Sequence, residues 1–385
     1  MHHHHHHKST KILILGAGPA GFSAAKAALG KCDDITMINS EKYLPYYRPR
    51  LNEIIAKNKS IDDILIKKND WYEKNNIKVI TSEFATSIDP NNKLVTLKSG
   101  EKIKYEKLII ASGSIANKIK VPHADEIFSL YSYDDALKIK DECKNKGKAF
   151  IIGGGILGIE LAQAIIDSGT PASIGIILEY PLERQLDRDG GLFLKDKLDR
   201  LGIKIYTNSN FEEMGDLIRS SCVITAVGVK PNLDFIKDTE IASKRGILVN
   251  DHMETSIKDI YACGDVAEFY GKNPGLINIA NKQGEVAGLN ACGEDASYSE
   301  IIPSPILKVS GISIISCGDI ENNKPSKVFR STQEDKYIVC MLKENKIDAA
   351  AVIGDVSLGT KLKKAIDSSK SFDNISSLDA ILNNL

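Results

Sequence analysis

Short runs of apolar residues that end in glycine-rich turns predict most of the strands in this chain. The run at 12–15, Ile-Leu-Ile-Leu, leads into Gly16-Ala-Gly18-Pro19-Ala20-Gly21 and then into an alanine-rich stretch that predicts a helix. A second run at 149–152 leads into Gly153-Gly-Gly155-Ile156-Leu157-Gly158 and a helix that ends near Ser168. Continuous apolar runs are typical of strands covered on both faces, as in parallel sheets. The pattern therefore predicts two α/β units.

Further short apolar segments predict the other strands of these two units. They lie at 35–38, 78–80, 85–89, 94–97, 108–111, 173–178, 204–206, 222–226, 246–249 and 260–265. Helices are predicted at 133–145 and 277–292. The order of elements after residue 149 repeats the order at the start of the chain, which indicates an internal repeat.

From residue 303 the pattern changes to shorter strands in which apolar and polar residues alternate. The strands are predicted at 307–309, 312–316, 337–342 and 347–353, followed by a helix at 358–368. Alternation is typical of an antiparallel sheet with one solvent-facing side. We therefore expect a small third domain of α+β type.

Composition narrows the function classes. Among 385 residues, 50 are basic and 51 acidic, which gives no case for a nucleic acid or a membrane as partner. Residues 1–7 are interpreted as an expression tag; without it, two histidines remain, so no metal site is expected. Since no signal peptide precedes the first strand, we expect a cytoplasmic protein.

The cysteines are expected to be buried, reduced thiols. All seven are scattered and none forms a Cys-x-x-Cys motif: Cys32, Cys143, Cys222, Cys263, Cys292, Cys317 and Cys340.

The glycines of the first turn suit a dinucleotide. Gly16 permits the tight turn, Gly18 lets the backbone approach a pyrophosphate, and Gly21 lets the helix pack on the strand. Pro19 fits the first helical turn, where a missing N–H is no loss. The free N–H groups and the dipole of the helix N-terminus then favour phosphate.

Carboxylates stand where a ribose would be held in both units. Glu41 lies twenty residues beyond Gly21, although Asn39 directly follows the strand, so either could bind the first ribose. Glu179 lies twenty-one residues beyond Gly158. A carboxylate there binds ribose hydroxyls and repels a 2′-phosphate, so NADH is expected over NADPH.

Five motifs in this order resemble those of the FAD-dependent pyridine nucleotide-disulfide oxidoreductase-like family. They are Gly16-Ala-Gly18-Pro19-Ala20-Gly21, Leu108-Ile-Ile-Ala111-Ser112-Gly113, Gly153-Gly-Gly155-Ile156-Leu157-Gly158-Ile-Glu160, Ala226-Val-Gly228-Val-Lys-Pro231-Asn232 and Tyr261-Ala-Cys-Gly264-Asp265. Together they cover roughly residues 8–300 and are specific as a set.

The resemblance implies FAD on the first glycine turn, with Asp265 near its ribityl and phosphate, and NADH on the second. It also implies two nested Rossmann-like domains. The FAD-binding domain would comprise 8–116 and 233–302, the NADH-binding domain 117–232, and the small third domain 303–385.

The electron acceptor is decided, in this family, near residues 40–53. Disulfide reductases carry Cys-x4-Cys there, whereas this chain has no cysteine in that stretch. The sequence Pro45-Tyr-Tyr-Arg48-Pro-Arg-Leu51 instead resembles the branch that serves rubredoxins or ferredoxins, together with the flavin portion of assimilatory nitrite reductases. The short third domain, in place of a siroheme module, is most similar to NADH:rubredoxin oxidoreductases. The expected partner is rubredoxin or a similar small acidic iron protein. The alternatives are an NADH oxidase that reduces O2 and a reductase of another carrier such as a ferredoxin. The short third domain favours a monomer.

Arg48 and Glu160 are the candidate catalytic residues. In relatives the glutamate that matches Glu160 pairs with a lysine beside the flavin, but Glu53 stands at that lysine's position here. Either Arg48 supplies the positive charge near the cofactor, or the pair is not used and Glu160 is structural.

Overall fold

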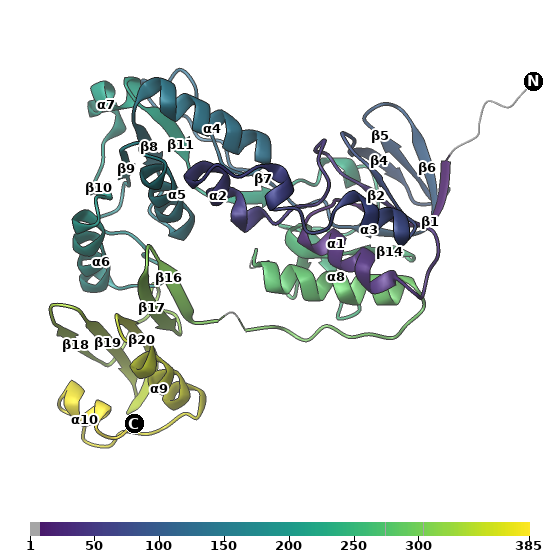
Figure 1. The fold of residues 1–385 in the computed structure, drawn as a ribbon. Helices are drawn as coiled ribbons and strands as arrows, with labels where there is room; N and C mark the ends of the chain where they lie inside the picture. Colours follow the sequence, from purple (N-terminus) through teal and green to yellow (C-terminus); the bar gives the residue numbers. More distant parts are fainter. Residues whose placement is uncertain (1–7, 274, 303) are drawn as a thin grey trace, which may run out of the picture. The chain divides into compact units, whose positions relative to one another are not determined.

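The computed structural model describes residues 8–273, 275–302 and 304–385 (Figure 1). The expected tag at 1–7 and Pro303, the expected first residue of the third domain, lie outside the described residues. The described chain divides into two compact units, the first of which contains the chain up to Leu51, Lys59–Asn117 and Gly228–Ile302. The second unit contains Asn52–Asn58, Lys118–Val227 and residues 304–385.

The first unit is built on a sheet with β1 at its centre. Among the described strands the order is β3-β2-β1-β6-β5-β4, with β14 also paired to β6. The pairs β1–β2, β2–β3, β1–β6 and β6–β14 are parallel, whereas β4 and β5 are antiparallel additions. The elements of this unit are β1 (Lys8–Leu15), α1 (Pro19–Ala28), β2 (Ile35–Ile38), α3 (Asn69–Lys74), β3 (Ile77–Ile80), β4 (Ala85–Asp89), β5 (Leu94–Leu97), β6 (Lys102–Ile110), β7 (Ser114–Ala116), β12 (Val229–Pro231), β13 (Ile247–Val249), β14 (Ile260–Ala262), β15 (Ala267–Phe269) and α8 (Ile277–Ala291).

The apolar runs of the sequence form the core of this sheet. Ile12–Leu15 of β1 and Leu108–Ile110 of β6 are all buried, because α1 and α8 cover the sheet. Burial of these side chains is the main favourable term for the unit.

The second unit holds a smaller parallel sheet and an antiparallel one. Among the described strands the orders are β10-β9-β8-β11 and β16-β17-β20-β19-β18. Helix α2 (Leu51–Ala56) begins at the boundary of the units. The other elements are α4 (Tyr133–Lys146), β8 (Ala149–Ile152), α5 (Ile156–Asp167), β9 (Ala172–Gly175), α6 (Arg188–Arg200), β10 (Lys204–Tyr206), α7 (Gly215–Arg219), β11 (Cys222–Thr225), β16 (Ile306–Val309), β17 (Ile312–Cys317), β18 (Lys327–Thr332), β19 (Tyr337–Lys343), β20 (Lys346–Ile353), α9 (Val356–Asp367) and α10 (Leu378–Leu382).

The expected α/β class is confirmed, with two parallel sheets and a small α+β part at the C-terminal end. One expectation for the antiparallel sheet is wrong. Its strand β19 is buried from Tyr337 to Leu342 rather than exposed on alternate residues. The reason is that α9 lies against β20 on this sheet while α6 also packs on β19 and β20, so the middle strands are covered on both faces.

Some elements differ from the sequence-based expectation. The strand expected at 173–178 ends at Gly175, because its neighbour β10 pairs only with residues 173–175. Helix α6, strand β18 and helix α10 were not expected. None of the helices in the described ranges is long and apolar enough to cross a membrane.

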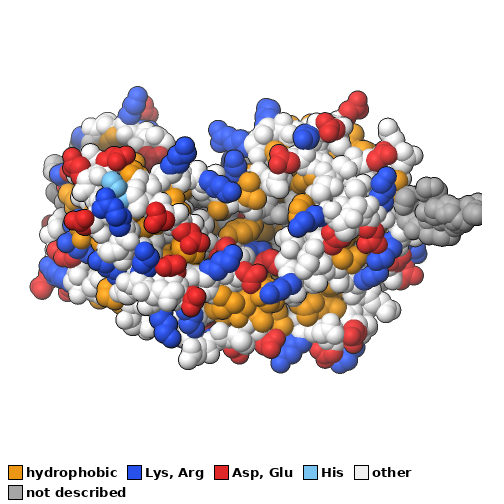
Figure 2. All heavy atoms as spheres, turned by 90° about the horizontal axis from the view of Figure 1, so that it is seen from above, with side chains coloured by type: hydrophobic (Ala, Val, Ile, Leu, Met, Phe, Trp, Pro, Cys, Tyr) orange, Lys and Arg blue, Asp and Glu red, His pale blue; other side chains and the backbone are white. Residues whose placement is uncertain are grey.

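Charged side chains of both signs are interspersed over the face of the protein shown in Figure 2. This agrees with the near-zero net charge of the sequence. No group of three or more metal-ligating side chains occurs among the residues that the structure describes.

Candidate functional site

The first glycine turn joins β1 to α1 and leaves an open space at the helix N-terminus. A Cβ atom on Gly16, whose φ is +112°, would lie 2.1 Å from the Ala111 carbonyl oxygen at the end of β6. A Cβ atom on Gly21 would lie 2.0 Å from the carbonyl oxygen of Gly16. In contrast, no atom lies within 4 Å of a Cβ built on Gly18. Two glycines are therefore required by packing, and the third borders free space.

The second glycine turn, between β8 and α5, repeats this geometry in the other unit. A Cβ atom on Gly153 (φ +133°) would lie 2.4 Å from the Ala226 carbonyl oxygen after β11. A Cβ atom on Gly158 would lie 2.2 Å from the carbonyl oxygen of Gly153, and nothing lies within 4 Å of one on Gly155. In both turns, therefore, packing requires the first and third glycines of the motif, and the middle one borders free space.

Both turns fit a pyrophosphate. Gly18 and Gly155 are the N-caps of α1 and α5, and neither helix has a side-chain cap, so their first N–H groups are available to a ligand. Pro19 occupies the first turn of α1, as expected, while Ala20 is buried beneath it. Negative charge at these helix ends is stabilised by the N–H groups and the helix dipole.

Beside the first turn, the loop after β2 brings Glu41 and Arg48 together. Arg48 Nη2 lies 2.9 Å from Glu41 Oε2, and the hydroxyl of the buried Tyr46 donates to Glu41 Oε1 at 2.7 Å. Asn39 is also buried; its amide donates to the Tyr43 carbonyl, and its oxygen accepts the Glu41 N–H. Asn39 is therefore a buried residue that holds the loop by hydrogen bonds, and Glu41 is the half-buried carboxylate of this loop.

Asp265 lies on a short turn after β14, close to the N-terminus of α8. Burial raises the pKa of its carboxyl, although the positive charge of Arg48 partly opposes that shift. The preceding Gly264 (φ +75°) donates its N–H to Gln283 Oε1 on α8 at 2.9 Å. Asp265, Arg48 and the first glycine turn are thus parts of one region in the first unit.

The turns after β6 and β11 lead the chain out of the first unit and back into it. Ser112 is exposed, and Gly113 (φ +71°) and Gly228 (φ +102°) adopt the left-handed conformation. Strands β7 and β12 beyond these turns pair antiparallel, and the Asn117 N–H donates to the Gly228 carbonyl at 3.0 Å. The expected small-residue turn thus forms the neck of this unit.

In the second unit, Glu179 lies four residues past the end of β9 and meets an arginine that sequence analysis missed. Arg188, the first residue of α6, places Nε 2.8 Å and Nη2 2.6 Å from Glu179 Oε1. The hydrogen bond from Arg188, with a smaller contribution from its charge, lowers the pKa of Glu179. The only sequence signal for Arg188 is its place after Asp187, a residue type favoured at helix N-caps.

Large apolar side chains are exposed on the elements that carry the second turn. Leu157, in the first turn of α5, is 75% exposed, and Ile177, two residues before Glu179, is 72% exposed. Ile156 begins the same helix and is half-buried. An apolar surface beside a phosphate cradle suits the flat rings of a dinucleotide.

Glu160, on the second turn of α5, faces the small C-terminal sheet. Its Oε1 accepts the N–H of Ser310 at 2.9 Å, in the tight turn between β16 and β17. The hydroxyl of Ser310 is itself a buried atom without a hydrogen-bond partner. Glu160 therefore joins the glycine-turn helix to this hairpin.

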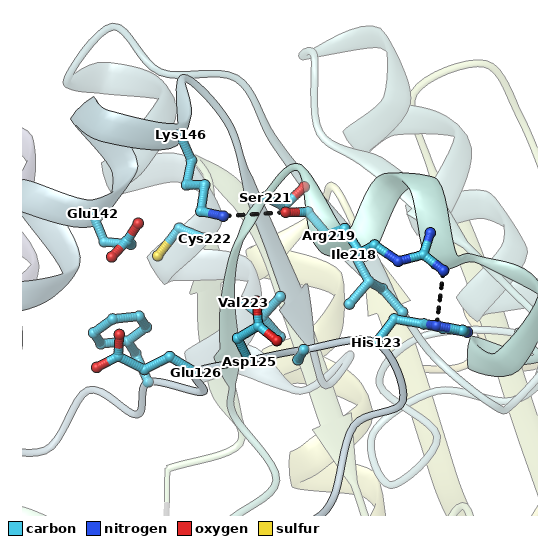
Figure 3. Close-up of a pocket in the computed structure, with 12 residues that line it drawn as sticks. His123, Asp125, Glu126, Glu142, Lys146, Ile218, Arg219, Ser221, Cys222 and Val223 are labelled. Atoms are coloured by element: carbon cyan, nitrogen blue, oxygen red, sulfur yellow. Dashed lines mark hydrogen bonds between the residues drawn. The ribbon is translucent and has the colours of Figure 1, made fainter.

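A pocket of about 190 Å³ lies elsewhere in the second unit, at the N-terminal ends of β8 and β11 (Figure 3). Two hydrogen bonds join residues that line this pocket. Lys146 Nζ donates to the Arg219 carbonyl at 3.1 Å, and Arg219 Nη2 lies 3.2 Å from His123 Nδ1. Ligands of parallel α/β sheets bind at the opposite, carboxyl ends of the strands, where the glycine turns are. The candidate site is therefore at the glycine turns.

Two family descriptions match the sequence. "Pyridine nucleotide-disulphide oxidoreductase" matches residues 10–284, and "Rubredoxin NAD+ reductase C-terminal domain" matches residues 303–370. The second match coincides with the region that carries the antiparallel sheet.

Curated relatives and solved structures with similarity to this chain are reductases as well. The nitrite reductase [NAD(P)H] of Bacillus subtilis is 32% identical over 91% of this chain, which spans only 46% of that protein. The rubredoxin-NAD(+) reductase of Pseudomonas putida is 28% identical, over 73% of this chain and 80% of its own. The fold is similar to that of putidaredoxin reductase in its covalent complex with putidaredoxin, with a TM-score of 0.77, 20% identity and coverage of 94% and 93% of the two chains. The chain spans about half the length of several of the curated relatives it matches.

Proposed function

The chain belongs to the pyridine nucleotide-disulphide oxidoreductase family, and on this basis we propose that it is an FAD-dependent reductase that takes a hydride from NADH and passes single electrons to rubredoxin. The observation that carries the proposal is the pair of equivalent glycine cradles in a chain without a cysteine between residues 33 and 142. Two dinucleotides can bind, and no thiol pair stands at residues 40–53 to take the electrons.

The first cradle is proposed to hold FAD. The N–H groups at the start of α1, with Gly16, Gly18 and Gly21, would bind its pyrophosphate, and Ala111, Ser112 and Gly113 would border it. Glu41 is assigned to the adenosine ribose rather than Asn39, because Asn39 is buried and its amide bonds to the loop. The Glu41 oxygens each bind one loop residue, but a carboxylate has further lone pairs that can accept ribose hydroxyls. Asp265, with its raised pKa, would accept a ribityl hydroxyl, which offsets its loss of water.

Arg48 is proposed to hold the cofactor phosphates by charge. Its side chain is 26% exposed and already near Asp265 and Glu41, so it lies in the region of the first cradle. Its ion pair with Glu41 positions both groups before the cofactor binds. This preorganisation reduces the entropy that binding would otherwise cost.

The second cradle is proposed to hold NADH. Gly153, Gly155 and Gly158 would bind its pyrophosphate, Glu179 would accept the ribose hydroxyls, and Leu157 and Ile177 would cover the rings. As a carboxylate, Glu179 would repel a 2′-phosphate and favour NADH over NADPH. Arg188 orients this carboxylate.

Flavin, when bound, accepts a hydride from a nicotinamide and releases the electrons one at a time. The protein residues bind and orient the two cofactors. Of the two alternatives for Glu160, its bond to Ser310 supports the structural one: Glu160 is a positioning residue that fixes α5 against the β16–β17 hairpin.

Rubredoxin as the acceptor is supported by the C-terminal match and by the similarity to the Pseudomonas putida rubredoxin-NAD(+) reductase. A ferredoxin-type carrier is the second candidate, favoured by the similarity to putidaredoxin reductase and to a ferredoxin-NAD(+) reductase subunit of Pseudomonas putida. We also propose that the enzyme works as a monomer.

The test is anaerobic stopped-flow spectroscopy of the purified flavoprotein. The protein is reduced with NADH and then mixed with rubredoxin, with a ferredoxin or with O2 while flavin absorbance is followed. Fast reoxidation by rubredoxin that slows with added salt supports the proposal. Fast reoxidation by O2 with no response to either iron protein would instead indicate an oxidase.

A further inference from the structure

Helices α1 and α8 of the first unit run side by side in the same direction. A Cβ atom on Gly284 would lie 2.2 Å from the Ala20 carbonyl oxygen, and one turn later a Cβ on Gly288 would lie 2.3 Å from that of Ala24. At the carboxyl ends, Lys31 Nζ reaches Glu294 Oε1 at 3.0 Å. The register is thus kept from the first turn of the helices to the residues just beyond them.

A cysteine stands at or just beyond the carboxyl end of each helix. Cys292 is the C-cap of α8, and Cys32 follows α1, with its N–H bonded to the Ala28 carbonyl. Cys32 is a neighbour of Cys292 and contributes, after burial, to the raised pKa of the Cys292 thiol. The neighbouring Lys31–Glu294 ion pair shows independently that the two chain segments meet here.

These two thiols differ from the other cysteines in exposure. Cys32 and Cys292 are half-buried, which corrects the expectation that all cysteines are buried. The remaining ones are buried: Cys143, Cys222, Cys263, Cys317 and Cys340. Thiol oxidation requires access as well as proximity.

We propose that Cys32 and Cys292 are a redox-sensitive dithiol that a peroxide converts to an intramolecular disulfide between the ends of α1 and α8. The inference stands on this packing and does not depend on the proposed function. Nothing in the dinucleotide chemistry uses these thiols.

The reaction balances with hydrogen peroxide as the oxidant. The Cys32 sulfur attacks one peroxide oxygen, the O–O bond breaks, and a sulfenic acid and one water form. The Cys292 sulfur then attacks the Cys32 sulfur, the S–O bond breaks, and the disulfide and a second water form. In sum, two thiols lose two electrons and two protons to one peroxide. A dithiol reductant reverses the step.

Cys32 is the first thiol to react, for a structural reason. Burial, and to a smaller extent the neighbouring Cys32, raise the pKa of Cys292 to about 12, so this thiol keeps its proton. Cys292 is therefore the resolving partner.

The disulfide would staple two helices whose N-termini border the first glycine cradle. A Cβ atom on Gly264, beside Asp265, would lie 2.7 Å from Ala20 Cβ in the first turn of α1 and 3.8 Å from Ala280 Cβ in the first turn of α8. Because the crosslink closes a very long loop, it restricts the unfolded chain strongly. We expect the melting temperature of the oxidised protein to rise by about 5 °C.

The experiment uses the reduced, FAD-loaded protein, treated with hydrogen peroxide and then with catalase. Thiols are counted after unfolding, and crosslinked peptides are mapped by mass spectrometry. The wild type should lose two of its seven thiols, yield a Cys32–Cys292 peptide and regain both thiols with dithiothreitol. C32S and C292S should yield no such peptide and show no rise in melting temperature.

Cys143 and Cys222 are also neighbours but are both buried, so this pair is the internal control. C143S should oxidise at Cys32 and Cys292 as the wild type does. Retention of all seven thiols, a disulfide-linked dimer on a non-reducing gel, or a Cys143–Cys222 peptide in place of Cys32–Cys292 would each overturn the proposal.

Discussion

A single ion pair, between Glu179 and Arg188, is expected to decide whether the second cradle prefers NADH or NADPH. Glu179 is held by Arg188 through two short hydrogen bonds, although both side chains are substantially exposed. The pair places one negative and one positive group at the expected ribose position. The balance between them sets whether a 2′-phosphate is repelled or attracted.

Replacing Glu179 with serine should therefore weaken selectivity for NADH. Without the carboxylate, Arg188 is available to a 2′-phosphate, so the ratio of kcat/KM for NADH to that for NADPH should fall about 10-fold. Steady-state kinetics with both nucleotides provide the measurement. Glu213→Ser, at an exposed site on the same unit, is the control, and an unchanged ratio in Glu179→Ser would show that Glu179 does not meet the ribose.

Asp187 is the residue on which the contact between α6 and the antiparallel sheet depends. It is 8% exposed, caps α6 through the Gly190 N–H, and accepts bonds from the Tyr337 hydroxyl at 2.6 Å and from Arg330 Nε at 2.8 Å. Removing it leaves both donors without their acceptor.

We expect Asp187→Ala to destabilise the second unit by about 3 kcal/mol, because α6 loses its cap and the buried Tyr337 hydroxyl loses its acceptor. Urea unfolding followed by circular dichroism measures the loss. Asp189→Ala is the matched control, since its carboxylate lies 3.8 Å from Arg330 and is 49% exposed. Equal effects of the two substitutions would contradict the role given to Asp187.

At the scale of elements, hairpins and turns connect parts that are distant in sequence. The β16–β17 hairpin reaches α5 through Ser310 and Glu160, and the turn at 250–253 is tied to residues after α8 through His252. Each tie rests on one or two side chains, so each can be tested alone.

Glu160→Ala should raise the KM for NADH about 5-fold while kcat changes less than about 2-fold, because α5 loses its contact with the hairpin. Glu160→Gln retains an acceptor oxygen and should resemble the wild type. If both variants instead lose kcat together, Glu160 takes part in the hydride step and the positioning role is wrong.

His252 should make stability depend on pH. Its Nδ1 lies 2.8 Å from Asp251 and its Nε2 2.6 Å from Asp295, which raises its pKa above the ordinary 6.5. In the folded protein the carboxylates of Asp251 and Asp295 therefore bind protonated His252 more tightly than neutral His252. Its stabilisation is therefore fully present below about pH 6.5 and is lost as the pH rises through the higher, folded-state pKa.

The measurement compares the tag-free wild type with His252→Gln. The difference in melting temperature should be larger at pH 5.5 than at pH 8.5. A difference that grows with pH, or that is the same at both values, would show that His252 does not act through these two carboxylates.

Sequence reasoning succeeded where a structural requirement is local. Gly21 is fixed by its contact with Gly16 in the same strand-turn-helix segment, so the spacing of the two glycines identifies the turn, although Gly16 also meets Ala111 after β6. It missed Arg188, Ser310 and the Asp187 cluster, because Glu160 meets Ser310, and Asp187 meets Tyr337, only through tertiary packing. The same limit explains why the exposure of Cys32 and Cys292 was not foreseen.

At the scale of the whole molecule, partner binding depends on charge distribution. The face shown in Figure 2 carries both signs in a mixed pattern, so docking of an acidic carrier would rely on a few local charges. Lys308 on β16 is an exposed candidate, whereas Arg330 is engaged by Asp187.

Lys308→Glu should slow the second-order oxidation of the reduced enzyme by rubredoxin about 5-fold at low salt and reduce its salt dependence. Stopped-flow traces at several salt concentrations test this. Lys244→Glu, at an exposed site in the first unit, is the control for net charge. An unaltered rate for Lys308→Glu would exclude this part of β16 as a docking surface.

The neck formed by β7 and β12 also bears on protein engineering. Ala116 and Val229 are paired neighbours, so the chain leaves the first unit and returns to it at adjacent points. Insertions with closely spaced ends are the ones that host proteins tolerate best. The neck is therefore a natural exchange point, where another ligand-binding module with neighbouring termini could be installed to build a chimeric sensor.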